Sequence, residues 1–121
     1  AIHVTNDDSE VWLTEVNNLP NFFGVWSNHT VTYDGVLHEF KYYINGELKL
    51  TKAAGWTDAL TFKNGGPLVF GTVQFQTSPS LTTGSAAQPW ASYLTGQLDE
   101  IRIFNRALSS TEVQQIYDDV M

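Results

Sequence analysis

The sequence predicts an all-β protein, an antiparallel two-sheet β-sandwich with one short C-terminal α-helix over about residues 110–119. Charged residues make up only 16% of the chain, whereas Thr, Ser, Asn, Gly and aromatic residues are plentiful, which is typical of a β-sandwich with many loops. Short runs of alternating apolar and polar residues follow one another, separated by turn-forming residues. A helical pattern is clear only near the C-terminus.

Length and charge limit the classes of protein that this chain can belong to. At 121 residues it is long enough for one domain with a modest core, predicted to span residues 1–121. The absence of cysteine excludes disulfides and cysteine-based zinc sites, and the absence of an apolar run of about 18 residues predicts no insertion into a membrane. A formal net charge of -7 disfavours nucleic acids as partners and favours neutral ligands or cations.

The first third of the chain predicts a hairpin followed by a longer strand. Residues 2–5 and 11–16 alternate on either side of an acidic turn at residues 6–9, which turn-forming propensity explains better than calcium binding. Residues 22–33 predict the next strand, which ends before Asp34 and Gly35. Trp12 and Trp26 fall within these strands, so we expect both in the core.

Residues 39–50 predict a second hairpin, which turns at Asn45 and Gly46. A two-residue loop would send the leucines of the return strand to the face opposite Ile44. A three-residue loop with Gly46 in the left-handed conformation keeps these apolar side chains on one face, so we predict a bulged turn. The predicted pairs are Ile44 with Leu48 and Tyr42 with Leu50.

Two further strands are predicted at residues 60–62 and 68–73. Residues 75–92 form the least periodic stretch, rich in Thr, Ser, Gly, Ala and Pro. A loop of this length inside a compact domain is usually functional or disordered, so we interpret it as an inserted loop.

The C-terminal stretch, residues 96–117, predicts a strand, a polar turn and an amphipathic helix. Leu98 is out of phase with the two isoleucines that follow it, which predicts a β-bulge at Asp99 and Glu100. Ser109 and Glu112 have the spacing of a capping box. Leu108 and Val113 can form a hydrophobic staple. The helix then presents one apolar stripe, made of Val113, Ile116, Tyr117 and Val120.

These residues carry a resemblance to a known family. The run G-Q-L-D-E-I-R-I-F-N-R-A-L-S-S-T-E-V at residues 96–113 resembles the closing signature of laminin-G-like, concanavalin A-like lectin and glucanase jelly-roll domains. Residues 26–35, 43–48 and 68–71 resemble its W-x-H-V-A-x-T-Y-D-G, Y-[IV]-[ND]-G-x-L and L-x-[IF]-G segments, so the resemblance covers about residues 25–117 in order.

The resemblance implies a concanavalin A-like jelly roll that lacks its usual N-terminal strands. Such domains usually open with several strands, and only about two are available before residue 25. An uncovered sheet edge is an aggregation hazard that proteins generally manage. We therefore expect association with another protein chain or a homo-oligomer.

Catalytic chemistry is not predicted. A glycosidase on this fold needs two carboxylates across a groove, and the E-x-D-x-x-E pattern of jelly-roll glucanases does not occur in the sequence. The histidines are His3, His29 and His38, and they have neither Cys partners nor H-E-x-x-H spacing. The chain is therefore expected not to be an enzyme.

The sequence contains better candidates for ligand binding than for catalysis. Trp56 and Trp90 fall in predicted loops, where an exposed indole offers a rigid platform for the apolar face of a sugar. The alternative is that each Trp closes the edge of the core. For Asp99, the resemblance implies a metal site, a structural calcium ion held together with backbone carbonyls. The alternatives are an ion pair with Arg102 or Arg106, or hydrogen bonds to backbone amides.

Taken together, the sequence predicts a non-catalytic binding module that recognises a glycan or cell-surface polysaccharide. It would serve in adhesion within a larger secreted, surface or phage protein, so the expected location is extracellular, at the cell surface or on a virion. The alternative is a structural or assembly domain that contacts protein on a particle or scaffold. Glycan hydrolysis would require catalytic residues upstream.

Overall fold

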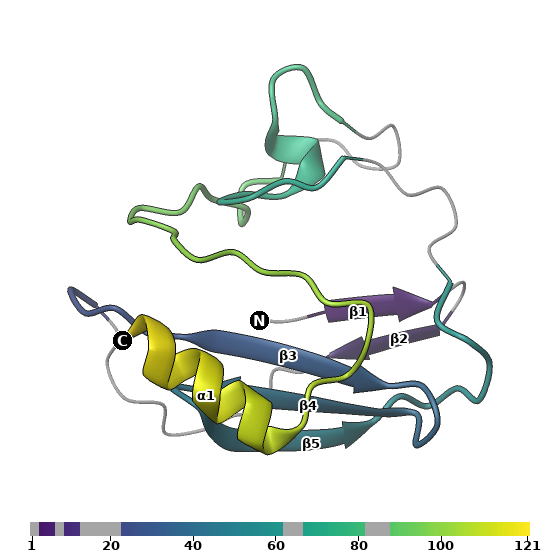
Figure 1. Cartoon of the computed structure of the whole chain (residues 1–121). Helices are drawn as coiled ribbons and strands as arrows, with labels where there is room; N and C mark the ends of the chain where they lie inside the picture. The colour runs from purple at the N-terminus through teal and green to yellow at the C-terminus, as the bar shows by residue number, and fades with distance from the viewer. Residues whose placement is uncertain (1–2, 7–8, 13–22, 62–66, 82–87) are drawn as a thin grey trace. The chain divides into compact units, whose positions relative to one another are not determined.

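The computed structural model describes residues 3–6, 9–12, 23–61, 67–81 and 88–121 (Figure 1). The chain divides into two compact units. The first unit comprises Ala1–Phe62 and Ile103–Met121, and the second comprises Lys63–Arg102. The prediction of one domain over residues 1–121 stays a prediction.

The first unit begins with a two-stranded antiparallel sheet. Strand β1 (His3–Asn6) pairs with β2 (Ser9–Trp12). The predicted hairpin is therefore confirmed, and Trp12 lies on its second strand as expected. The Asp7 and Asp8 turn and the predicted extension of the strand to Val16 lie outside the described residues.

A three-stranded antiparallel sheet follows in the order β3-β4-β5. Its strands are β3 (His29–Asp34), β4 (Glu39–Ile44) and β5 (Glu47–Ala53), so β4 is central. Strand β3 begins at His29, later than predicted, because His29 already pairs with Ile44, the last residue of β4. Trp26 therefore lies before β3 and has no partner residue on β4. It is 54% exposed, and its predicted place in the core is wrong.

The turn between β4 and β5 differs from the predicted one. Ile44 pairs with Glu47, so the loop has two residues, Asn45 and Gly46, with φ values of 51° and 77°. Positive φ at both positions defines the type I′ turn that Asn-Gly favours. The predicted left-handed Gly46 and the Tyr42–Leu50 pair are confirmed. The predicted Ile44–Leu48 pair is wrong.

The bulged turn would have added one unpaired residue to the hairpin. Such a residue is present, but it lies within the β4–β5 strand pair and not in the turn. Tyr43 pairs with Leu48 and Tyr42 with Leu50, and the register shifts between Tyr42 and Tyr43. Lys49 is therefore the residue without an opposite partner on β4. This irregularity is a β-bulge on β5.

Hydrophobic clusters cover both faces of β4. Phe40 and Tyr43 are an odd number of residues apart, so their side chains point to opposite faces of the sheet. One cluster contains the buried residues Val11, Phe40, Ala54 and Trp56, with Tyr33, Leu50 and Leu60 packed against it. The other contains Tyr43, Leu108 and Val113, with Ile116 packed against it.

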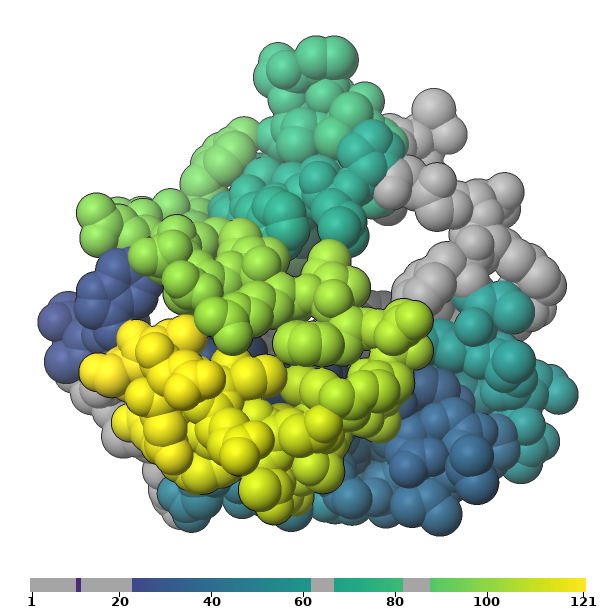
Figure 2. All heavy atoms as spheres, in the orientation of Figure 1, coloured from purple at the N-terminus to yellow at the C-terminus, as the bar shows by residue number. Residues whose placement is uncertain are grey.

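Helix α1 (Ser110–Val120) confirms the predicted helix and covers the Tyr43 face of the sheet (Figures 1 and 2). Val113 is fully buried beside Leu108, as expected for the predicted staple. A Cβ atom on Gly46 would lie 2.5 Å from Oε1 of Gln114, so the helix also approaches the β4–β5 turn closely.

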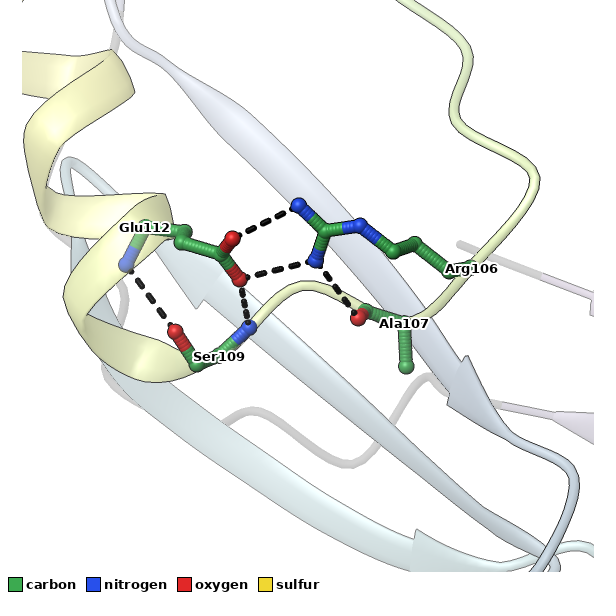
Figure 3. A network of polar contacts seen from close by, with 4 residues as sticks. All are labelled: Arg106, Ala107, Ser109 and Glu112. Carbon is green, nitrogen blue, oxygen red and sulfur yellow. Dashed lines mark hydrogen bonds and ion pairs between the residues drawn. The ribbon is translucent and has the colours of Figure 1, made fainter.

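Both halves of the predicted capping box are present at the start of α1 (Figure 3). The Glu112 amide donates to Oγ of Ser109 at 3.3 Å, and the Ser109 amide donates to Oε2 of Glu112 at 2.8 Å. Arg106 adds two hydrogen bonds to the same carboxylate, at 2.6 and 2.9 Å. These contacts hold the pKa of Glu112 at about 2, chiefly through Arg106 and then through Ser109.

Within the described residues, three predicted strands are not formed. Residues 60–61, 68–73 and 96–104 are irregular, and Phe62 lies outside the described residues. Glu100, at the predicted bulge, has a φ of 52°. In the second unit, the regular element among the described residues is a short 3-10 helix, η1 (Gln74–Gln76). The antiparallel strands and the C-terminal helix agree with the predicted class, but the two-sheet sandwich is not confirmed.

Candidate functional site

Trp90 is the most exposed aromatic residue of the second unit among those described, at 70% exposure. It lies in a turn in which the Ala91 amide donates to the Gln88 carbonyl at 3.1 Å. The ring of Phe75, carried by η1, meets the indole edge-on, with centroids 5.5 Å apart and an interplanar angle of 76°. Such an edge-to-face pair fixes the orientation of a ring while leaving a face of it accessible.

Hydrogen bonds tie the segment that carries Trp90 to the segment that carries Phe75. Two of them involve the ends of the segments, Leu94 N to Gly71 O at 2.6 Å and Thr72 Oγ1 to Ser92 O at 3.0 Å. Two others involve Gln76, whose Nε2 donates to Ala91 O at 3.1 Å and whose carbonyl accepts from Tyr93 Oη at 2.6 Å. The four residues that follow Trp90 are therefore cross-linked to the segment that carries Phe75. We call residues 71–77 and 88–94 the Trp90 platform.

Trp56 occupies a different environment. It lies outside the strands, as predicted, and it is only 8% exposed, which agrees with the alternative that this indole closes the edge of the core. Its ring meets Phe40 edge-on at 5.8 Å and 81°, and Nε1 donates to Tyr33 Oη at 3.1 Å. This is the position of a tryptophan that closes the core. Its predicted contact with a ligand stays a prediction, on a side chain with little free surface.

Asp99 is exposed, and its Oδ1 accepts a hydrogen bond from the Glu100 amide at 2.8 Å. Of the alternatives weighed for this residue, a bond to a backbone amide is the one observed. Arg102 pairs with Glu100 at 2.7 Å, and Arg106 pairs with Glu112. The described residues contain no group of three or more His, Cys, Asp or Glu side chains that could hold a metal ion. Calcium at Asp99 stays a prediction.

Sequence reasoning missed a polar network at one end of the β3–β4 pair. His29 Nδ1 lies 2.7 Å from Tyr42 Oη, and His29 Nε2 lies 2.8 Å from Ser27 Oγ. Partial burial lowers the pKa of His29 and raises the pKa of Tyr42, because it disfavours the charged form of each group. The network depends on the β3–β4 register, which places Tyr42 diagonally across from His29 and which the sequence alone does not give.

The predicted site residues fall in different parts of the structure. Trp56 belongs to the first unit, whereas Trp90 and Asp99 belong to the second. Trp90 is the one that combines exposure with a fixed orientation. The signal that could have separated the two tryptophans is their surroundings. Trp56 closely follows the predicted hairpin, with the apolar residues Ala53 and Ala54 shortly before it, whereas Pro89 directly precedes Trp90 in a segment without strand periodicity.

The described elements define a class, an antiparallel β protein with a capped C-terminal helix packed on one sheet. A family model described as the concanavalin A-like lectin/glucanases superfamily matches residues 1–114. The chain therefore belongs to this superfamily, and the resemblance to laminin-G-like domains is confirmed.

One solved structure is similar in both fold and sequence. It is a crystal structure of residues 221–444 of an S-layer domain-containing protein from Clostridium thermocellum, with 28% sequence identity and a TM-score of 0.56. The match covers 82% of this chain but only 42% of that chain, so this chain spans less than half of its neighbour. No curated protein matches the sequence significantly. No helix among the described residues has the length and apolar character needed to cross a membrane.

Proposed function

We propose that this chain is a non-catalytic carbohydrate-recognition or adhesion module of a larger surface or secreted protein. The observation that carries the proposal is Trp90, which is 70% exposed and held edge-on by Phe75. Sugar rings present apolar C–H faces, and an exposed indole covers such a face at little cost in conformational entropy.

The hydrogen bonds of the Trp90 platform strengthen the proposal. A binding loop that is ordered before the ligand arrives avoids the entropic cost of ordering its side chains, about 0.5–1.5 kcal/mol for each. Tyr93 contributes to this order through its bond to the Gln76 carbonyl, and its ring is itself 64% exposed. Trp90 and Tyr93 would thus offer two aromatic surfaces on one cross-linked loop.

Membership of a superfamily that contains both lectins and glucanases fits a glycan ligand. The sequence lacks the E-x-D-x-x-E pattern of jelly-roll glucanases, which favours recognition over hydrolysis. The similarity to an S-layer domain-containing protein supports an extracellular or cell-surface location. The ligand would then be a glycan or cell-surface polysaccharide.

The test is binding to a polysaccharide array by the wild-type chain and by Trp90→Ala. We expect Trp90→Ala to lose binding at least tenfold while its melting temperature stays close to that of the wild type. Trp26→Ala is the matched control, because it removes an indole that is 54% exposed in the other unit. Equal binding by all three proteins, or loss confined to Trp26→Ala, would contradict the proposal.

A second candidate, an assembly role, is favoured by an apolar tip on the β3–β4 hairpin. Val36 is 86% exposed and Leu37 is 65% exposed. Asp34 Oδ1 accepts from the amides of Val36 and Leu37 at 2.8 and 3.0 Å, which fixes the turn. These bonds, Leu37 first, hold the pKa of Asp34 below its usual value. An assembly role predicts an oligomer that Val36→Ser with Leu37→Ser dissociates, and a monomer at micromolar concentration in light scattering would argue against it.

A further inference from the structure

We infer that the ligand of the Trp90 platform is an uncharged polysaccharide, which rests on the proposed function and adds the chemical class of the glycan. The first observation is a gap in the charge pattern. Residues 64–98, between Lys63 and Asp99, contain no Asp, Glu, Lys, Arg or His. At the overall charged fraction of 16%, these 35 residues would carry about six charges. All thirteen acidic and all six basic residues lie outside this stretch.

The charge-free stretch contains the whole Trp90 platform. The polar side chains of the platform are therefore all neutral amides and hydroxyls, namely Thr72, Gln74, Gln76, Thr77, Gln88, Ser92 and Tyr93. Several of them hold the loop together, as Thr72, Gln76 and Tyr93 do through their hydrogen bonds across it. The platform thus offers aromatic surface and neutral hydrogen-bonding groups, but no opposite charge for an ionised ligand.

Trp90 has an additional neutral group to offer. Its side chain is 70% exposed, and no hydrogen bond joins its Nε1–H to another described residue. An indole N–H is a donor only, so it can bind a hydroxyl or ring oxygen of a sugar whose C–H face contacts the ring. Both contacts suit an uncharged sugar.

Electrostatics disfavours the two charged classes of glycan for separate reasons. An anionic glycan such as a polyuronate would be repelled by the net charge of -7 and would lose hydration at the platform without gaining an ion pair. A cationic glycan would be attracted at long range by the same net charge. It would still find no carboxylate in the platform to replace the hydration that its ammonium groups lose. A neutral glycan avoids both costs.

The test uses matched polymers that share a backbone and differ in charge. The pairs are hydroxyethyl cellulose with carboxymethyl cellulose, methyl-esterified with free polygalacturonate, and acetylated chitin oligosaccharide with its deacetylated form. In at least one pair we expect the neutral member to bind about tenfold or more tightly than the charged one. Because no ion pair forms, its affinity should change less than about twofold between about 20 and 500 mM NaCl.

A charge-addition variant tests the same point from the side of the protein. Ser92 is exposed and lies two residues from Trp90, so Ser92→Lys introduces a cation into the platform. We expect this variant to gain salt-sensitive binding of a carboxylated polymer. Thr51→Lys, at an exposed position of β5 in the first unit, makes the same change in net charge and should not gain it.

The outcomes separate this inference from the proposed function. Tighter binding of a charged member by the wild-type chain, with affinity that falls steeply with salt, would overturn the inference but leave carbohydrate recognition in place. Binding to neither member of any pair would overturn the proposed function, and the inference with it. Selective, salt-insensitive binding of a neutral member that Trp90→Ala abolishes supports both.

Discussion

Replacing Trp56 tests whether this side chain belongs to the core rather than to a ligand site. Trp56 is 8% exposed and is clustered with Val11, Phe40 and Ala54. Truncation of such a residue to alanine removes its packing and leaves a cavity, at a cost of about 3–5 kcal/mol. At about 4 °C per kcal/mol for a domain of this size, we expect the melting temperature of Trp56→Ala to fall by about 12–20 °C.

The polar contact of Trp56 can be measured separately. Trp56→Phe and Tyr33→Phe each remove one partner of the Nε1 to Oη hydrogen bond, which is 3.1 Å long. In a double-mutant cycle we expect a coupling energy of about 1 kcal/mol, the usual net value of such a bond. Denaturant unfolding followed by circular dichroism gives all four free energies of unfolding. The reasoning is refuted if Trp56→Ala costs less than about 1 kcal/mol.

The loss of stability in Trp56→Ala also affects how glycan-binding measurements on this variant are interpreted. Natural domains are stable by only about 5–15 kcal/mol, so Trp56→Ala can lose a large part of the folded population. A loss of glycan binding in that variant therefore says nothing about contact with the ligand unless the protein is shown to be folded at the assay temperature. Trp56→Phe, which keeps an aromatic ring, is the better variant for a binding assay.

Three further predictions concern the C-terminal stretch. Ser109→Ala removes the acceptor of the capping box and should lower the free energy of unfolding by about 1 kcal/mol, measured by denaturant unfolding; Ser109→Asp, which can also cap, should restore most of it. The folded pKa of Glu112, about 2, lies below its ordinary value of 4.5, so its stabilising contribution is present above about pH 4.5 and is lost as the pH falls toward 2. The melting temperatures of the wild type and Glu112→Gln should therefore converge on acidification, and a difference that stays constant down to pH 2 would exclude this role. If Asp99 holds calcium, CaCl₂ should raise the melting temperature of the wild type but not of Asp99→Asn, and a wild type that is indifferent to EDTA would rule the ion out.

The C-terminal helix was predictable because its signals are local. The capping box joins residues three positions apart, and the staple joins Leu108 to Val113, so neither depends on the rest of the fold. The face that the helix covers was not predictable in this way. Its partner on the sheet is Tyr43, whose hydroxyl lies 3.1 Å from Ser110 Oγ across 67 positions of sequence.

The strands predicted at residues 68–73 and at the start of residues 96–117 depend on hydrogen-bonding partners that the sequence does not identify. Alternation indicates that a segment can form a strand, but a strand exists only where a second segment completes its hydrogen bonds. The apolar residues of the second segment remain exposed, with Ile101 at 52% and Ile103 at 74%. The alternation of this segment is typical of a strand, but the segment pairs with no other strand among the described residues.

The candidate site was predictable in residue type but not in exposure. Both Trp56 and Trp90 lie outside the strands, as predicted, and the choice between a core role and a platform role was left open for each. Contacts from distant segments decide the environment of each indole. Tyr33 and Phe40 of the sheet enclose Trp56, whereas Phe75 supports the indole of Trp90 from one side.

The β4–β5 hairpin shows why a correct argument about strand register can give the wrong turn. In a sheet with one buried face, Leu48 and Leu50 would have to lie on the same side. The sheet is in fact covered on both faces, by α1 over Tyr43 and by the Phe40 cluster on the other side. Asn45 and Gly46 could then keep the two-residue turn that their conformations favour.

The bulge at Lys49 follows from the same two-sided burial. Leu48 pairs with Tyr43 on the helix side, whereas Leu50 pairs with Tyr42 and packs against the Phe40 cluster. Without an extra residue on β5, a continuous ladder from the two-residue turn would place Leu48 and Leu50 on the same face, on the helix side. The bulge therefore delivers one leucine to each face. The need for apolar residues on both faces of β5 follows from the packing of α1 on the sheet, which the sequence alone does not give.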